Sequence, residues 1–79
     1  MSEDHLTPCQ DWVLTSLCRF SPTAPITTSD LATKLSHSVH RTEIYLDQLA
    51  AMGLVRVHHV SGEPAWRPSS DGLAIGTVA

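Results

Sequence analysis

The stretch L-D-Q-L-A-A-M-G-L-V, residues 46–55, decides the fold of this chain. Leu46, Leu49 and Ala50 repeat at the i, i+3, i+4 spacing that marks the buried side of an amphipathic helix. Gly53 supplies the left-handed position that commonly ends a helix, and Leu54 is placed to pack back over that end. The stretch therefore predicts a helix that ends at Gly53 and leads directly into an extended segment.

The same buried side continues toward the start of this helix. Thr42 and Val39 lie one and two turns before Leu46, and Ser38 is a good N-cap residue. The expected helix therefore covers about residues 39–52. Its outward positions are then His40, Arg41, Glu43, Ile44, Asp47 and Gln48.

Two further helices are expected upstream. Thr7 followed by Pro8 is an N-cap with proline at the first helical position, and the prolines in 21–25 end that helix, which gives 8–20. Residues 26–27 form a short extended stretch, and Thr28 or Ser29 caps a second helix that ends at 36–37. The apolar residues on the inner sides of these two helices are Val13, Leu14, Leu17, Cys18, Leu31, Ala32 and Leu35.

Downstream, two extended runs surround a turn, which predicts a β-hairpin. Apolar and polar residues nearly alternate over 55–60, a turn is expected over 61–64, and the second run covers 65–68 with Trp66 as a packing residue that anchors the hairpin. Pro68 ends the second strand or marks it as an edge. Because strand neighbours alternate, one of His58 and His59 is expected to face the interior or the first helix. Residues 69–72 form a turn or a helix cap, and 73–75 add about one helical turn.

Length and composition bound the possible functions. The chain has 79 residues, 42% hydrophobic and 16% charged, which fits one small folded domain. We expect this domain to cover 8–75, between a flexible acidic N-terminus over 1–7 and a frayed end over 76–79. No apolar run exceeds four residues and the N-terminus has no signal-peptide pattern, so the expectation is a cytoplasmic protein without a membrane segment.

The net charge of −3 resides at the N-terminus. Residues 1–11 contain three acidic residues and no Lys or Arg, so the other 68 residues balance to zero. Such a chain does not bind polyanions through bulk charge, and any nucleic-acid contact must come from a local patch.

The segment I-T-T-S-D-L-A-T-K-L-S-H-S (26–38), followed by 46–55, resembles small bacterial winged helix-turn-helix transcriptional regulators. The resemblance covers about residues 8–75 and is at the superfamily level. It implies an α+β fold of three helices and a C-terminal β-hairpin wing, and a sequence-specific regulator whose third helix enters the major groove of duplex DNA.

The resemblance also implies a set of DNA contacts. Arg41 can bond guanine O6 and N7, Glu43 can accept from cytosine N4, and His40 can donate to a base or a phosphate. Tyr45 is either a phosphate contact or a cap on the core. The candidate DNA-binding residues are Lys34, Ser38, His40, Arg41, Glu43, Ile44, Gln48, His58, His59 and Arg67.

A winged-helix module that binds protein and not DNA is the alternative interpretation. Regulators of this kind usually carry more Arg or Lys on the third helix than Arg41 alone, and the acidic side chains of Glu43 and Asp47 share its outward side with Ile44. A homodimer is expected in either case, because the apolar residues near the chain ends exceed what a small core can cover. These residues are Leu6, Trp12, Leu73, Ile75 and Val78.

Enzymatic and metal-dependent functions have little support in the sequence. It contains no Gly-rich phosphate loop and no nucleophile motif, so we expect no catalytic activity and no cofactor. The five histidines and two cysteines lack the paired spacing of zinc sites, and no metal is expected. Cys9 and Cys18 lie nine residues apart, about 180° around one helix, which argues against a disulfide between them.

Overall fold

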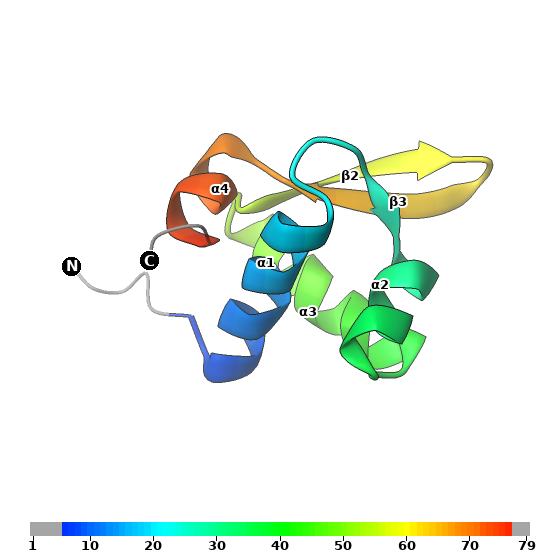
Figure 1. Cartoon of the computed structure of the whole chain (residues 1–79), viewed down its shortest axis with the longest axis horizontal. Coiled ribbons are helices and arrows are strands. Elements are labelled where there is room, and N and C mark those ends of the chain that lie inside the picture. Colours follow the sequence, from blue (N-terminus) through cyan, green and yellow to red (C-terminus); the bar gives the residue numbers. More distant parts are fainter. Residues whose placement is uncertain (1–5, 77–79) are drawn as a thin grey trace.

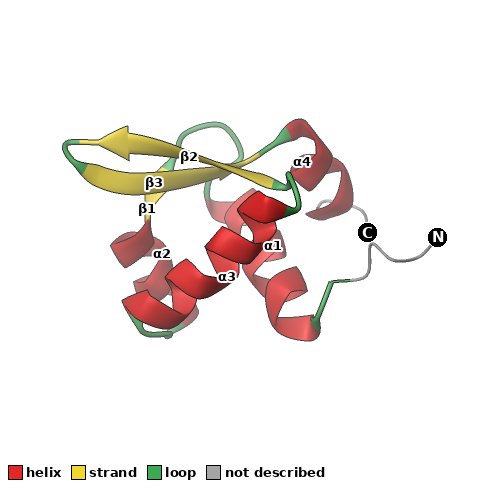
Figure 2. Cartoon of the chain, turned by 180° about the vertical axis from the view of Figure 1, so that it is seen from behind, coloured by secondary structure: helices red, strands yellow, loops and turns green. Residues whose placement is uncertain are grey.

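The computed structural model describes residues 6–76 and has the expected α+β architecture. The elements are α1 (Pro8–Phe20), β1 (Ile26–Thr27), α2 (Thr28–Leu35), α3 (Val39–Ala51), β2 (Val55–Val60), β3 (Glu63–Pro68) and α4 (Ser70–Gly76). Figure 1 shows α1, α2 and α3 below a small sheet and α4 beside it, with the β2–β3 hairpin extending away from α4. The same arrangement is seen from behind in Figure 2, where α3 crosses in front of α1.

The sheet has the order β1-β3-β2, and both strand pairs are antiparallel. Strand β1 pairs only with Ala65 and Trp66, so neither Pro64 nor Pro68 faces a third strand. Proline lacks the N–H that a strand flanked on both sides would need to donate. Strand β3 ends at Pro68, which confirms the expectation that the second strand ends there.

The hairpin turn is shorter than the sequence predicts. Ser61 (φ 54°) and Gly62 (φ 82°) both have positive φ, which gives the strands a tight two-residue connection. Glu63 and Pro64, expected in the turn, are instead the first residues of β3. The prediction of a four-residue turn was wrong because Ser61 adopts the left-handed conformation next to the glycine.

The core lies where the three main helices meet the sheet. Leu14, Leu17, Leu31, Leu46 and Leu49 are fully buried. Trp66 is 3% exposed, and its indole Nε1 donates a hydrogen bond of 2.8 Å to Thr28 Oγ1. The interpretation of Trp66 as the packing residue of the hairpin is confirmed.

The helix ends follow the capping residues closely. Thr7 and Gln10 form a reciprocal capping box at the start of α1, and the Ser38 hydroxyl accepts from the backbone N–H of Arg41 at the start of α3. Gly53 has the expected positive φ of 78°. The cap of α2 is Thr27, and not Thr28 or Ser29, because Thr27 is still extended and its hydroxyl accepts from Asp30 N–H.

Two burial predictions were wrong. Val39, placed on the buried side of α3, is 48% exposed, because it is the first residue of the helix and the buried side begins one turn later at Thr42. Both His58 and His59 are exposed, although one was expected to face the interior. Beyond Val55, β2 is an edge strand that projects past the helices, so neither of its faces is covered.

Helix α4 packs against α1 at the end of the sheet that lies away from the hairpin turn. A Cβ atom on Gly72 would collide with the carbonyl oxygen of Leu54, and one on Gly76 would lie 2.6 Å from Cys18 Sγ. Both expected free thiols lie on α1, where Cys9 is exposed and Cys18 is buried. The predicted acidic and frayed ends fall largely outside the described residues, although Leu6 packs against the core and Thr7 caps α1.

In the described part of the chain, no helix combines the length and the apolar character needed to cross a membrane.

Candidate nucleic-acid interface

Helix α3 is held against α1 and α2 by one buried stripe. Thr42, Leu46 and Leu49 are each 0% exposed, and the Thr42 hydroxyl donates a hydrogen bond of 2.9 Å to the carbonyl oxygen of Ser38. That bond satisfies the one polar group in the stripe, so threonine is tolerated at a buried position. The turn before α3 is fixed by Ser36, whose φ is 58°.

The opposite side of α3 is exposed over its whole length. All six outward positions expected from the sequence are exposed: His40, Arg41, Glu43, Ile44, Asp47 and Gln48. Gln48 is engaged, since its Oε1 accepts a hydrogen bond of 2.7 Å from Gln10 Nε2 of α1. The exposed side of α3 therefore carries one cation, Arg41, and two carboxylates, Glu43 and Asp47.

Tyr45 lies between the exposed side of α3 and the core. Its ring is half-buried and packs against the core cluster. Hydrogen bonding to the neighbouring Cys9 thiol raises the pKa of Tyr45, with a smaller opposing effect from the positive charge of Arg41. Tyr45 thus caps the core, which was one of its two expected roles, and it lies close enough to Arg41 to interact with its charge.

His37, in the turn before α3, belongs to a small aromatic cluster. The rings of His37 and Trp12 meet edge-on with centroids 4.9 Å apart, and the centroid of Tyr45 lies 6.3 Å from that of His37. His37 therefore occupies a packing position between α1 and α3. Within residues 6–76, no group of three His, Cys, Asp or Glu side chains is arranged to hold a metal ion.

Two other candidates already have contacts within the protein. Lys34 Nζ lies 5.0 Å from the centroid of the Phe20 ring, which places this cation beside the end of α1. The Ser38 hydroxyl is used as the cap of α3. Both side chains remain exposed.

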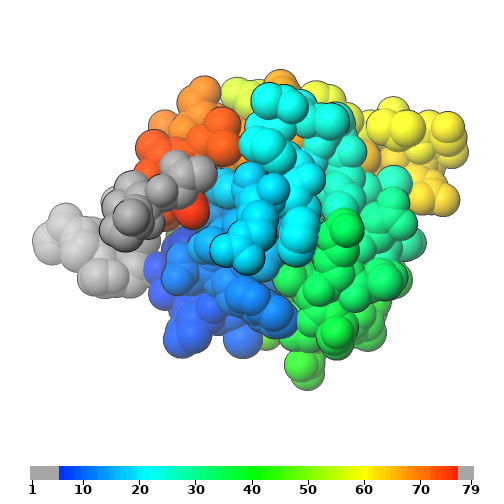
Figure 3. All heavy atoms as spheres, viewed as in Figure 1, coloured from blue at the N-terminus to red at the C-terminus, as the bar shows by residue number. Residues whose placement is uncertain are grey.

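The wing contributes basic side chains from both of its strands. In the space-filling view of Figure 3 it protrudes from the body as the yellow segment. His58 and His59 are exposed on β2, while Arg67 on β3 is half-buried and its Nη1 donates a long 3.5 Å hydrogen bond to the carbonyl oxygen of Thr23.

One exposed basic residue of the wing was not among the candidates predicted from the sequence. Arg56, which is exposed, stands directly opposite Arg67 in the β2–β3 pair. The available signal was the pairing register: a two-residue turn at 61–62 pairs 56 with 67, whereas the expected four-residue turn does not.

Comparison with solved structures finds transcriptional regulators. A probable transcriptional regulator from Pseudomonas aeruginosa matches with a TM-score of 0.79 and 19% identity over 91% of this chain and 55% of that one. ZitR, a zinc-responsive MarR family member of Lactococcus lactis, matches with a TM-score of 0.77 and 18% identity over 95% of this chain and 51% of that one. The multiple antibiotic resistance repressor MarR matches with a TM-score of 0.73 and 26% identity over 90% of this chain and 51% of that one.

These matches identify the fold as the winged helix-turn-helix of bacterial transcriptional regulators. The chain spans about half the length of each of them. No protein-family model matches the sequence, and no curated protein matches it either.

The fold also occurs within an enzyme. Human N-acetylserotonin methyltransferase matches with a TM-score of 0.63 and 19% identity over all of this chain but only 28% of the methyltransferase. The same fold therefore serves in regulators and in an enzyme, and it does not by itself define a function.

Proposed function

We propose that this chain is a DNA-binding transcriptional regulator of the cytoplasm, without catalytic activity, that reads the major groove of duplex DNA with α3. The observation that carries the proposal is the exposed start of α3. His40, Arg41, Glu43 and Ile44 are all exposed, and their side chains form no hydrogen bond or ion pair with residues 6–76. The regulators that share the fold support the same function.

The chemistry of these side chains suits base recognition. Arg41 has two parallel donors for O6 and N7 of guanine, and Glu43 has an acceptor for the amino group of cytosine. The N–H groups at the starts of α2 and α3 favour phosphate at the edges of the groove. Gln48, which the sequence suggested as a DNA-binding residue, must first break its hydrogen bond to Gln10.

Selection from a pool of random duplexes tests this function. The pool is passed over the immobilised full chain at low salt, and the retained duplexes are sequenced after several rounds. A common motif that the Arg41→Ala variant no longer enriches supports reading by α3. Enrichment of no motif, or of the same motif by the variant, contradicts it.

Binding to a protein is the second candidate, and the composition of the same surface favours it. The exposed side of α3 carries Arg41 against Glu43 and Asp47, and the side chain of Ile44 is 43% exposed. Acidic side chains repel phosphate, whereas an exposed isoleucine suits an apolar contact. A heparin column separates the two functions: retention supports a DNA-binding cationic surface, and flow-through supports the protein-binding module.

We also propose that the chain acts as a homodimer. Trp12 is 45% and Ile75 43% exposed, and these side chains are available to a second copy. Leu6 and Leu73, which were expected in the same interface, already pack against the core, and Val78 lies outside the described residues. Two copies would read half-sites about 34 Å apart. Sedimentation equilibrium of wild type and of Trp12→Ser tests the dimer.

A further inference from the structure

Strand β2 is an open edge of the sheet. The strand order is β1-β3-β2, so one side of β2 pairs with β3, and within residues 6–76 no strand pairs with its other side. Residues 56–60 are exposed, and their backbone forms no hydrogen bond with the described residues outside the pairing with β3. The strand contains no proline and no lysine, two residues that commonly protect an edge. Its free backbone groups can therefore pair with a further strand.

The register of the hairpin decides which groups of β2 point to this edge. The two-residue turn closes on the pair Val60–Glu63, and hydrogen-bonded and non-hydrogen-bonded pairs alternate along an antiparallel ladder. The even-numbered residues of β2 therefore direct their N–H and C=O groups toward β3. Those of Val57 and His59 point outward. Pro64 agrees with this alternation, because it stands opposite His59, in a pair where β3 donates no N–H to β2.

The opposite edge of the sheet is closed to the same kind of pairing. Strand β1 has only two residues, and β3 extends beyond it in both directions. On that side of β3, the N–H positions beyond β1 belong to Pro64 and Pro68, which have no N–H to donate. Among the described residues, a run of free backbone donors and acceptors is therefore found along β2.

We propose that β2 pairs with β2 of a second copy of this chain, antiparallel and around a two-fold axis at His58. The free groups of Val57 in each copy then meet those of His59 in the other, and each of these two pairs exchanges two hydrogen bonds. A shift by two residues in either direction would instead pair one of them with the buried Val55 or with Ser61 of the turn. The two copies share a continuous sheet in the order β1-β3-β2-β2-β3-β1.

Charge favours a second copy as the occupant of this edge. Within its own chain, Arg56 stands opposite another cation, Arg67, and forms no ion pair with residues 6–76. In the proposed register, Arg56 of the second copy stands opposite Val60, which is itself the partner of Glu63. The Glu63 carboxylate and that guanidinium then share one face, with about 10 Å between their strands, and their long side chains can meet over Val60. Each copy therefore supplies a carboxylate that Arg56 of the other copy lacks.

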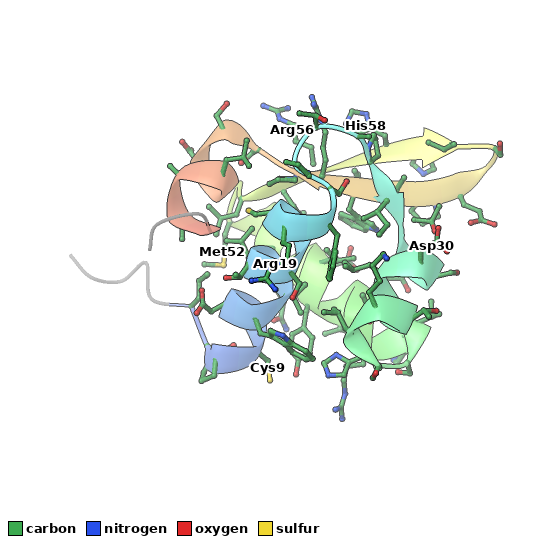
Figure 4. All side chains as sticks on the ribbon, in the orientation of Figure 1. Cys9, Arg19, Asp30, Met52, Arg56 and His58 are labelled. Atoms are coloured by element: carbon green, nitrogen blue, oxygen red, sulfur yellow. The ribbon has the colours of Figure 1, made fainter. Side chains whose placement is uncertain are left out.

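The exposed valines of the edge gain cover from the same pairing. Val57 is 44% and Val60 49% exposed. Val57 stands opposite the buried Trp66, so it lies on the face toward the helices, where it would meet His59 of the second copy. Val60 lies on the other face, where Figure 4 shows Arg56 and His58 extending from β2. There the stem of Arg56 from the second copy would cover Val60.

One test measures self-association of the full chain by sedimentation equilibrium over a range of concentrations. His59→Pro removes an outward N–H from each copy, and the hairpin already holds a proline in this pair, at Pro64. His59→Ala is the matched control, because it removes the same side chain and keeps the N–H. Thermal unfolding verifies that both variants are folded. His59→Pro should weaken self-association by about tenfold or more, since half of the hydrogen bonds between the copies are lost, and His59→Ala should weaken it much less.

A second test measures the register by cross-linking in the Cys9→Ser background, which removes the exposed native thiol. His58→Cys places two thiols opposite each other in a non-hydrogen-bonded pair, with Cα atoms about 4.5 Å apart, which suits a disulfide. Val60→Cys is the control, because Val60 is also exposed but lies about 13 Å along the strand from Val60 of the second copy. Under mild oxidation with diamide, His58→Cys should form covalent dimers and Val60→Cys should remain monomeric in a denaturing gel.

The proposal is independent of DNA binding and of the interface proposed through Trp12 and Ile75. It is overturned if wild type is monomeric at every concentration, or if His59→Pro associates as tightly as His59→Ala. Equal cross-linking of His58→Cys and Val60→Cys also overturns it. A dimer that Trp12→Ser abolishes and His59→Pro leaves unchanged would place the interface on the helices instead. Reading of DNA by α3 stands or fails separately, in the selection of random duplexes.

Discussion

The indole N–H of Trp66 donates a 2.8 Å hydrogen bond to the Thr28 hydroxyl, across 38 residues of sequence and in the interior of the protein. Trp66 lies in the part of β3 that pairs with both β1 and β2, and Thr28 begins α2. The bond therefore fixes the wing relative to the helix-turn-helix. Since α3 follows α2 after a short turn, this contact also sets the position of the wing relative to α3.

Thr28→Val is expected to lower the free energy of unfolding by about 1–3 kcal/mol, because it leaves the buried Trp66 N–H without an acceptor while keeping nearly the same side-chain shape. Urea denaturation measures the change. Thr15→Val, at an exposed position of α1, is the matched control and should stay within about 0.5 kcal/mol of wild type. Equal stabilities of Thr28→Val and wild type would show that the bond contributes nothing.

Gly72→Ala is expected to destabilise the protein by about 1–3 kcal/mol through overpacking. The new methyl group would overlap the Leu54 carbonyl oxygen, and backbone atoms cannot move aside as a side chain can. Ala74→Ser, at an exposed position of the same helix, should be nearly neutral. Thermal unfolding compares the two, and a Gly72→Ala protein as stable as wild type would contradict the close approach of α4.

Ser38→Ala is expected to cost about 0.5–2 kcal/mol of stability, because the Ser38 hydroxyl accepts the otherwise unpaired N–H of Arg41. Ser38→Gly should cost only a few tenths, since glycine is itself tolerated as an N-cap. Chemical denaturation distinguishes the two variants. If alanine and glycine are equally tolerated, the cap does not stabilise α3.

The buried Cys18 thiol predicts a loss of stability at alkaline pH. Burial raises the pKa of Cys18, so the unfolded chain releases this proton at a lower pH than the folded protein. The free energy of unfolding should therefore fall as pH rises past about 8.5, where an ordinary thiol ionises. Cys18→Ala should lack this fall, and Cys9→Ala, which removes the exposed thiol, should keep it. A flat profile for wild type between pH 8 and 9.5 would contradict the prediction.

Arg41→Ala is expected to weaken binding to the preferred DNA sequence by about 1–3 kcal/mol and to relax the choice of base at one position. The reason is the loss of two donors to guanine. Competition binding with the selected duplex and with single-base variants measures both effects. An unchanged affinity would remove α3 from the reading role.

The helices could be predicted because their signals are local. Thr7 with Pro8 defines the start of α1, and Gly53 the end of α3, by interactions within four or five residues of sequence. The outward side of α3 could be predicted for the same reason, from the helical spacing of its apolar residues. Val39 was misplaced since periodicity alone does not show where the neighbouring helices stop covering α3.

The wing could not be predicted to the same detail because it depends on register. The hairpin turn has two residues, Ser61 and Gly62, instead of the four that were expected, and this changes which residues of the two strands are paired. Arg56 stands opposite Arg67 only because of that pairing. Contacts between distant segments were likewise not accessible from the sequence. The hydrogen bond from Gln10 to Gln48, which engages a candidate DNA-binding residue, joins positions 38 residues apart.

The most direct test of the account is the binding of duplex DNA by the wild-type chain. Fluorescence anisotropy of a labelled random-sequence duplex, measured from low to physiological salt, reports this binding. The affinity should fall steeply as salt rises, because each phosphate contact releases counterions. Absence of binding at every salt concentration would contradict DNA binding and would favour the protein-binding function of the same surface.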